Sequence, residues 1–297
     1  MRGWVVTGCY GQLGSALVDQ LEREGVPVHA SDVDTLDIAD PAAVDASLDA
    51  LPPPAVLANA AAYTHVDRCE QEPEQAARAN REGPAVLARA CAARGIRLVH
   101  VSTDYVFAGK GKQPYRETDS TDPQSAYGRT KLEGEQAVFA AAPEALVVRT
   151  SWVFGRGRNF IAAILGQGVA RRAGEAQGPL RVVDDQRGCP TYAADLAEGI
   201  RALVEAKAQG LYHLSNAGET TWWDLARFCL DESDMADLEV ERIRTASLDL
   251  PAPRPAWSVL DCRKAGELGV WLRPWPEAVR AYLASNDSPL RNAGGSA

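Results

Sequence analysis

The stretch Trp4-Val5-Val6-Thr7-Gly8-Cys9-Tyr10-Gly11-Gln12-Leu13-Gly14 predicts how the first half of the chain folds. Its first four residues read as a short apolar strand, and a periodic helix follows over residues 14–24. Gly8 and Gly11 permit a tight turn and a close approach of the main chain to a pyrophosphate, whose charge lies at the helix N-terminus. Gly14 permits close packing of the helix on the strand. Strand, glycine turn and helix in this order predict a dinucleotide-binding unit.

Strands alternate with helices as far as about residue 150, and this alternation predicts an α/β fold with a doubly wound, Rossmann-type parallel sheet. The further strands are expected over residues 26–30, 55–62, 97–101 and 146–150. We expect three parts: a dinucleotide-binding core over 1–150, to which the chain returns near 190–215, a smaller α/β substrate-binding part mainly over 151–285, and a disordered tail over 286–297.

An acidic residue, Asp32, follows the second expected strand, where a carboxylate can bind the adenosine ribose hydroxyls. No lysine or arginine lies between Ala30 and Ala50 to hold a 2′-phosphate, so the local sequence favours NADH over NADPH. The alternative is that Asp32 is an ordinary loop carboxylate. Asp37 and Ile38 fall where an adenine edge would rest, and the small residues at 60–62 leave room for a cofactor.

The composition argues for a protein of the reducing cytoplasm. Hydrophobic residues make up 46% of 297 residues, and the formal net charge of -9 disfavours nucleic acid and anionic membranes as partners. Six cysteines and four histidines are scattered without disulfide or metal-ligand spacing, so no bound metal is expected. No apolar run is long enough to span a membrane, and we expect no signal peptide.

Tyr127 and Lys131 are four residues apart in an expected helix, so their side chains lie one turn apart on the same face. A lysine cation near a phenol favours the phenolate and lowers the phenol's pKa. A hydroxyl from Thr103 or Ser102, delivered by the expected strand 97–101, would hold a substrate oxygen beside the phenol. These groups suit proton transfer to or from a carbonyl oxygen. By itself, the Tyr–Lys spacing is common, and without further support it indicates an ordinary helix with an exposed lysine and a half-buried tyrosine.

The chain resembles the extended short-chain dehydrogenases, and within them the dTDP-4-dehydrorhamnose reductase family. The resemblance covers residues 1 to about 280. It rests on the glycine loop together with the following segments: Asn59-Ala60-Ala61-Ala62-Tyr63-Thr64-His65-Val66-Asp67, Ser102-Thr103-Asp104-Tyr105-Val106-Phe107, Tyr127-Gly128-Arg129-Thr130-Lys131, Gly134-Glu135, Arg149-Thr150-Ser151-Trp152-Val153-Phe154-Gly155, Val183-Asp184-Asp185-Gln186 and Arg254-Pro255.

The resemblance implies reduction of the C4 ketone of a dTDP-linked 6-deoxy-4-ketohexose to dTDP-L-rhamnose, a step of cell-wall or polysaccharide biosynthesis. It implies that Tyr127 is the proton donor, that Lys131 holds the nicotinamide ribose, and that Thr103 bonds the reacting oxygen. Asn80 matches the asparagine that supports the lysine through water. The cofactor-binding residues expected from motifs and resemblance together are Gly8, Gly11, Gln12, Leu13, Asp32, Asp37, Ile38, Ala60, Ala61, Ala62, Tyr63, Thr64, Asn80, Val101, Ser102, Tyr127 and Lys131.

For the nucleotide-sugar substrate, the resemblance implies sugar contacts from Thr103, Asp104 and Trp152. The diphosphate needs a cation, and Arg254 in its Pro-rich setting is the first candidate, with Arg158 behind it. Trp222 and Trp223 are expected to pack within the fold rather than to bind sugar.

Two positions depart from the family pattern. Cys9 and Tyr10 stand where some members carry a basic residue that favours NADPH, so both NADH and NADPH remain open as cofactors. Ala16 stands where some members carry a glutamate of a divalent-ion site between dimer halves. That metal site is therefore expected to be missing, and the protein is expected to be a monomer or a homodimer.

Two rival functions remain at this point. The first is a non-catalytic binding protein similar to the regulatory subunit of some methionine adenosyltransferases, against which the presence of Tyr127, Lys131 and Thr103 argues. The second is a 4-ketoreductase of another nucleotide deoxysugar.

Overall fold

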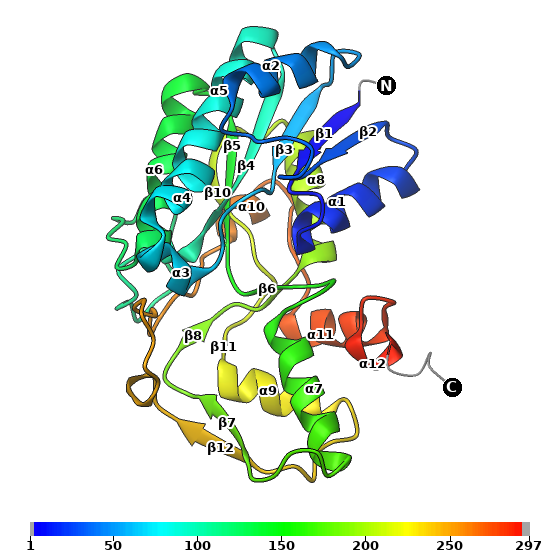
Figure 1. Ribbon diagram of the computed structural model, residues 1–297, viewed down its shortest axis with the longest axis vertical. Helices are drawn as coiled ribbons and strands as arrows, with labels where there is room; N and C mark the ends of the chain where they lie inside the picture. Colours follow the sequence, from blue (N-terminus) through cyan, green and yellow to red (C-terminus); the bar gives the residue numbers. More distant parts are fainter. Residues whose placement is uncertain (1–2, 293–297) are drawn as a thin grey trace.

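The structure is a computed structural model, and it describes residues 3–292. Six parallel strands form one sheet in the upper half of the molecule (Figure 1). Their order across the sheet is β10-β5-β4-β3-β1-β2, with β2 and β3 on opposite sides of β1. Ligands of open parallel sheets bind at the carboxyl ends of the strands, beside such a reversal of strand order. The strands are β1(Trp4–Thr7), β2(Val28–Ser31), β3(Val56–Asn59), β4(Arg97–Thr103), β5(Leu146–Thr150) and β10(Gly210–His213).

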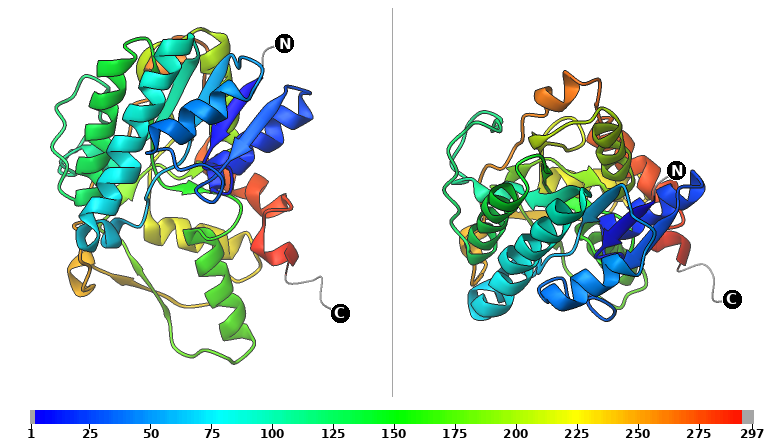
Figure 2. Two further views of the ribbon diagram at one scale, coloured as in Figure 1. Left: turned by 45° about the horizontal axis from the view of Figure 1, so that its top comes forward. Right: turned by 90° about the horizontal axis from the view of Figure 1, so that it is seen from above.

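Helices cover both faces of this sheet, as the view from above in Figure 2 shows. Alternate strand residues face opposite sides, so Val5 packs into one core while Trp4 and Val6 pack into the other. One core is shared with α1 and α8, and the other with α2, α5 and α6. The predicted doubly wound parallel sheet is confirmed. These helices are α1(Gln12–Arg23), α2(Pro41–Asp49), α5(Gly83–Arg94), α6(Ala126–Ala141) and α8(Ala193–Glu205).

Short polar side chains fix where several helices begin. The Asp40 side chain accepts hydrogen bonds from main-chain N–H groups at the start of α2, and Ser125 does the same for α6. Gly95, with φ of 63°, ends α5 in a left-handed conformation. Between β3 and α5 the chain forms three short helices: α3(Val66–Gln71), α4(Pro73–Ala77) and the π-helical turn η1(Arg78–Glu82).

After β5 the chain builds a smaller part, at the bottom of Figure 1, around its own apolar core. Its helices are α7(Phe160–Arg172), α9(Trp222–Asp231), α11(Trp275–Ala284) and α12(Pro289–Asn292), beside the parallel pair β7(Leu180–Val183) and β12(Val240–Ile243). The remaining shorter elements are β6(Val153–Phe154), β8(Arg187–Gly188), β9(Thr191–Tyr192), β11(Thr220–Thr221), α10(Arg263–Gly266), η2(Asp104–Val106) and η3(Thr245–Ser247).

Residues 193–213 return to the large sheet, where α8 packs on the α1 side and β10 pairs with β5 at the edge. The end of the chain differs from expectation, because residues 289–292 form α12 within the segment expected to be disordered. Asp287, just before α12, accepts a hydrogen bond from Arg156 over 2.9 Å. Residues 293–297 of that expected tail lie outside the described residues. None of the described helices is long and apolar enough to cross a membrane.

Candidate active site

The glycine loop between β1 and α1 leaves no room for a side chain at Gly8 or Gly14. A Cβ at Gly8, where φ is +76°, would lie 2.5 Å from the nitrogen of Ala61, and one at Gly14 would lie 1.9 Å from the oxygen of Gly8. No side chain caps the N-terminus of α1, so its first N–H groups are available to an anion. These features are compatible with the predicted contact between a dinucleotide pyrophosphate and Gly8, Gly11, Gln12 and Leu13, which stays a prediction.

Gln12 also links this loop to the smaller part of the protein. Its Nε2 donates a hydrogen bond to the carbonyl oxygen of Arg158 over 3.0 Å. The buried Oε1 of Gln12 has no hydrogen-bond partner within the described chain. The Arg158 side chain itself is exposed. Gln12 therefore positions the loop and keeps one acceptor free.

Asp32 stands directly after β2 and is held by the main chain. Its carboxylate accepts hydrogen bonds from the N–H groups of Tyr10 and Val33, each over 2.8 Å. The Tyr10 and Val33 side chains beside it are 73% and 81% exposed. The carboxylate is thus fixed in the glycine loop's neighbourhood, which suits the predicted ribose contact.

The predicted adenine contacts have other partners in the structure. Asp37 forms an ion pair with Arg78, and its Oδ1 accepts from the N–H of Ala39 over 2.9 Å. Ile38 is buried, and a Cβ at Gly83 would lie 2.6 Å from its side chain. Asp37 therefore holds the turn against η1 and Ile38 holds it against α5, and their contact with adenine stays a prediction.

The loop after β3, which contains Ala60 to Thr64, is fixed by two asparagines. Asn59 Oδ1 accepts from Thr7 Oγ1 over 2.8 Å and from Ala61 N over 3.1 Å. Asn80, in the π-helical turn η1, binds the main chain of Tyr63 through both ends of its amide, over 2.8 and 3.1 Å, and donates to Thr130 Oγ1 over 3.2 Å. The structure thus shows Asn80 as a clamp on this loop, and its expected water-mediated support of Lys131 remains a prediction.

Tyr127, in the first turn of α6, lies against the end of β4. Burial raises its pKa, which the nearby Thr103 hydroxyl opposes. The sequence-based expectation that Lys131 would lower this pKa is therefore wrong for the balance of forces in the structure, where removal of the phenol from water outweighs the other influences. A tyrosine with a raised pKa is fully protonated at neutral pH, as a proton donor must be.

Thr103 and Asp104 form a buried polar pair next to this phenol. Thr103 Oγ1 donates to Asp104 Oδ1 over 3.0 Å and accepts from the N–H of Tyr105 over 3.2 Å. Burial raises the pKa of Asp104 to about 6, opposed by the hydroxyls of Ser258 and Thr103. Asp104 Oδ2 has no hydrogen-bond partner in the part of the chain that the structure describes. Asp104 is 3% exposed, and Ser258 is the hydroxyl nearest to being a partner for its carboxylate besides Thr103.

Lys131 is buried one helical turn beyond Tyr127. Its Nζ donates to the carbonyl oxygen of Val101 on β4 over 2.6 Å. Burial lowers the pKa of Lys131 to about 8, and the nearby Glu135 opposes that shift. The three residues predicted to be catalytic are thus brought together by β4 and α6.

Trp152 stands two residues after Thr150, the partner of Thr103 in the sheet, and its ring begins an aromatic stack. Its backbone is in the left-handed region, with φ of 47°, and its ring packs so closely on Gly188 that a Cβ there would lie 2.5 Å away. The Trp152 ring is stacked on that of Trp222, with centroids 3.6 Å apart. Phe160 packs on Trp222, with centroids 4.5 Å apart. Trp222 therefore packs within the fold, as expected, by supporting Trp152.

Arg254 reaches the site from the segment between η3 and α10. It forms an ion pair with Asp67 over 2.7 Å, and its Nη1 donates to the carbonyl oxygen of Ala252 over 2.9 Å. A cavity of about 230 Å³ lies beside it and is also lined by Tyr105 and Ser125. Arg254 is thus a fixed cation at the edge of a hollow next to Tyr127's helix.

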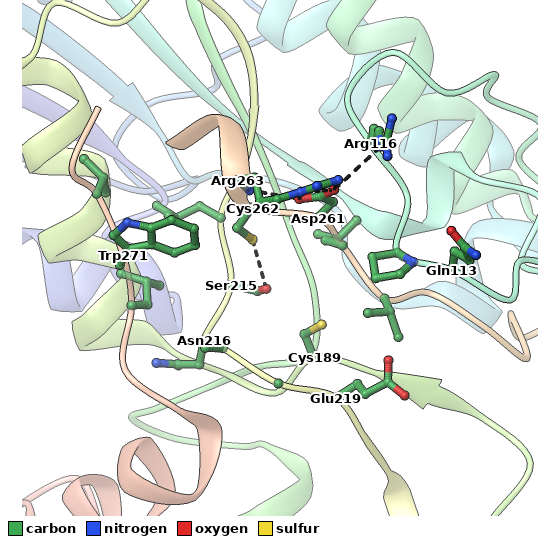
Figure 3. Close-up of a pocket in the computed structure, with 18 residues that line it drawn as sticks. Gln113, Arg116, Cys189, Ser215, Asn216, Glu219, Asp261, Cys262, Arg263 and Trp271 are labelled. Atoms are coloured by element: carbon green, nitrogen blue, oxygen red, sulfur yellow. Dashed lines mark hydrogen bonds and ion pairs between the residues drawn. The ribbon is translucent and has the colours of Figure 1, made fainter. Parts of the chain in front are cut away.

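Another cavity, of about 480 Å³, lies behind the site and is drawn in Figure 3. Cys189, which lines it, directly follows Gly188, the residue that supports Trp152 on the active-site side. Figure 3 shows Cys262 pointing toward Ser215, with Sγ and Oγ 3.4 Å apart, and Asp261 between Arg116 and Arg263. The residues predicted for the site do not line this cavity, so it is separate from the candidate active site.

A family described as the RmlD substrate binding domain matches residues 1–288. The chain belongs to this RmlD family. It is 44% identical to the dTDP-4-dehydrorhamnose reductase of Mycobacterium tuberculosis (strain CDC 1551 / Oshkosh), over 95% of this chain and 92% of that protein. It is 42% identical to a probable dTDP-4,6-dihydroxy-2-methyloxan-3-one 4-ketoreductase of Streptomyces antibioticus, over 97% of this chain and 98% of that protein.

A solved structure similar to this RmlD-family chain is that of dTDP-4-dehydrorhamnose reductase from Bacillus anthracis (strain Ames) in complex with NADP. The two superpose with a TM-score of 0.89 at 32% identity, over 95% of this chain and 99% of the other. The predicted family and Rossmann-type fold are thereby confirmed.

Several residues of this RmlD-family site were not predicted from the sequence. Ser258 lies near Asp104, Asp67 holds Arg254, and Gly188 supports Trp152. Their partners are far away in the chain, so no local pattern indicates these contacts, although Asp67 lies in a segment that carries the family resemblance. The Arg254-Pro255 segment was the one available signal that residues 251–258 approach the site.

Proposed function

We propose that the protein reduces the C4 ketone of dTDP-4-dehydro-6-deoxy-L-mannose (dTDP-4-dehydrorhamnose) to dTDP-L-rhamnose, with Tyr127 as proton donor. The observation that supports this most is the meeting of Tyr127, Lys131 and Thr103 at the carboxyl end of β4, beside a glycine loop that fits a dinucleotide. The names of relatives at 44% and 42% identity point to the same reaction type. The product would serve rhamnose-containing polysaccharides, made in the cytoplasm.

The protein's own side chains would donate the proton and stabilise the charge that develops during the reduction. A reduced nicotinamide, when bound, supplies the hydride that reaches the C4 carbon. The ketone oxygen then gains negative charge, and Tyr127 donates its phenolic proton to it while Thr103 orients the oxygen. The Lys131 ammonium, fixed on Val101, stabilises the phenolate that remains. One hydride and one proton are thus added, and the ketone becomes an alcohol.

A nicotinamide dinucleotide is the cofactor, and we propose a preference for NADH. Asp32 is held by Tyr10 and Val33 main-chain groups in a position to accept from ribose hydroxyls. A 2′-phosphate there would meet like charge from Asp32 and from Asp34, which lies close enough to Tyr10 to raise the pKa of that phenol. NADPH would bind more weakly for this reason, although the Bacillus anthracis structure holds NADP.

For the substrate, we propose that Asp104 and Trp152 contact the hexose and that Arg254 binds a diphosphate oxygen. Asp104 Oδ2 is a buried acceptor without a partner in the described chain, which a sugar hydroxyl would satisfy. Arg254 keeps N–H donors beyond those used by Asp67 and Ala252. The 230 Å³ cavity beside Arg254 is a suitable place for the nucleotide end.

A second candidate function is the reduction of a different dTDP-linked 4-keto sugar. The Streptomyces antibioticus relative, named for another ketone, is 42% identical over nearly the full length of both chains. The groups that would contact the hexose, Asp104 and Trp152, do not by themselves distinguish one 6-deoxy sugar from another.

The decisive experiment is incubation of the purified protein with dTDP-4-dehydrorhamnose and either NADH or NADPH, with the product identified by NMR. We expect oxidation of the cofactor and formation of dTDP-L-rhamnose. Faster turnover of a different dTDP-4-keto sugar would favour the second candidate. Absence of cofactor oxidation with every keto sugar would favour a binding protein instead.

A further inference from the structure

A buried ion pair lies directly behind Lys131. Glu135 on α6 binds Arg149 on β5 through two hydrogen bonds, Nε to Oε1 over 2.8 Å and Nη2 to Oε2 over 2.6 Å. Ser102 Oγ donates to the same Oε1 over 2.5 Å. The side chains of Arg149 and Glu135 are only 3% and 4% exposed, so water screens their charges weakly.

Glu135 is placed to act on the lysine. It stands four residues after Lys131 on α6, so the two side chains lie on the same face of the helix. Lys131 donates to the carbonyl of Val101, and Ser102, the next residue, donates to Glu135. Helix α6 is therefore hydrogen-bonded to two successive residues of β4: Lys131 binds Val101, and Glu135 binds Ser102.

The charged and titratable groups around Lys131 come from four elements. Tyr127 and Glu135 share its helix, and His100 acts on it from β4. Arg149 on β5 lies beyond Glu135, and Asp104 in η2 lies beside Tyr127. The low pKa of the buried His100 keeps that imidazole neutral. Glu135 is the carboxylate whose charge opposes the effect of burial on Lys131.

A buried ion pair is a weak source of stability, because the cost of removing two charges from water is comparable to their attraction. An apolar pair of similar size would fill this space equally well. The pair lies beside Lys131, which the proposed chemistry requires. An effect on this lysine therefore explains the ion pair better than stability does.

We propose that Glu135 is a positioning residue of the reduction, which keeps Lys131 charged and, through Ser102, holds the β4 main chain on which the lysine is fixed. Arg149 orients the carboxylate and limits how much of its charge reaches the lysine. This inference rests on the proposed reductase function and on the role of Lys131 in it.

The test is the pH dependence of turnover at saturating substrate and cofactor. In the wild-type protein, turnover falls as Lys131 loses its proton near pH 8. Glu135→Gln removes a nearby negative charge, so this alkaline limb moves down by about one pH unit. Arg149→Gln removes a positive charge, so the alkaline limb moves to higher pH. A merely structural role would lower turnover at every pH in both variants without moving the limb.

Glu133→Gln is the matched control, because Glu133 is on the same helix but exposed, paired with Arg81 over 3.4 Å. Its limb stays in the wild-type position. If Glu135→Gln fails to fold, the double variant Glu135→Gln/Arg149→Gln, which leaves no unpaired charge, is compared with Arg149→Gln alone. The limb of the double variant lies lower by about one unit.

Limbs that coincide in these comparisons would overturn the role of Glu135 while leaving the reductase function intact. A wild-type protein that reduces no keto sugar would instead overturn the proposed function itself, so the two failures are distinguishable.

Discussion

Arg254 and Asp67, 187 residues apart in the chain, form an ion pair over 2.7 Å at the edge of the candidate active site. Asp67 Oδ1 also accepts from the N–H of Ala252 over 3.1 Å, so it binds both the guanidinium and the main chain of the same segment. The arginine side chain is only 15% exposed. The cation expected to bind a diphosphate is therefore already in a fixed position, with little flexibility left to lose on binding.

Arg254→Gln is predicted to weaken binding of the nucleotide sugar. Loss of a hydrogen-bonded cation costs about 1.5–3 kcal/mol, so the KM for the sugar rises about 10- to 150-fold. Turnover at saturation changes little, because the arginine is away from the reacting carbonyl. The exposed Arg181, paired with Glu241 on the outside of β7, provides the control variant Arg181→Gln. An unchanged KM in Arg254→Gln would place the diphosphate elsewhere.

Asp104 predicts a pH dependence in substrate binding. Its pKa of about 6, raised by burial, means that it becomes a full acceptor for sugar hydroxyls only above that pH. The KM for the sugar therefore rises as the pH falls below about 6, and Asp104→Asn removes this inflection. The folded-state pKa is higher than the unfolded value of about 3.9, so the folded state binds more protons between pH 4 and 6. The same group therefore makes the free energy of unfolding decrease as the pH rises from 4 to 6. An inflection that persists in Asp104→Asn would assign it to another group.

Asp32→Ala is predicted to shift cofactor preference toward NADPH. Removal of a carboxylate near the 2′-phosphate relieves roughly 1 kcal/mol of repulsion, about fivefold in the ratio of the two dissociation constants. Fluorescence titration with NADH and NADPH measures the ratio directly. Asp45→Ala, on the exposed face of α2, controls for the change in net charge. Tighter binding of NADPH than NADH by the wild-type protein would show that Asp32 does not set the preference.

Lys131→Met separates catalysis from stability. Turnover falls sharply, because no cation remains to stabilise the phenolate. The free energy of unfolding at pH 7 does not fall, since holding the lysine charged at a pKa of about 8 costs the folded state about 3 kcal/mol. Lys264→Met is the matched control: Lys264 also donates to a main-chain carbonyl, that of Leu211, over 2.7 Å, but far from the site. Full turnover in Lys131→Met would remove the lysine from the mechanism.

The sequence predicted the framework of the molecule because the relevant signals are local. β5 and β7 begin and end where the apolar runs do, and Asp40, Ser125 and Thr221 begin helices through hydrogen bonds to residues two or three positions later. The strand β12 escaped prediction because only Ile243 of its four residues is buried. Its pairing with β7 depends on residues distant in the chain.

The site was predicted in outline and not in its electrostatics. Motif spacing is sufficient to place Tyr127 and Lys131 on one helical face. Burial is a tertiary property, however, and it reverses the expected direction of the Tyr127 pKa. The pairs Glu135–Arg149 and Asp67–Arg254 join segments that only the fold brings together.

The central claim is that Tyr127 donates the proton to the C4 oxygen of a dTDP-linked keto sugar. The most direct measurement is the single-turnover rate of cofactor oxidation in the wild-type protein and in Tyr127→Phe. Cofactor binding is measured separately, and Tyr212→Phe, on the edge strand β10, is the control. The account predicts that Tyr127→Phe binds the cofactor normally and reduces dTDP-4-dehydrorhamnose at least about a hundredfold more slowly. A rate in Tyr127→Phe equal to that of the wild-type protein would contradict it.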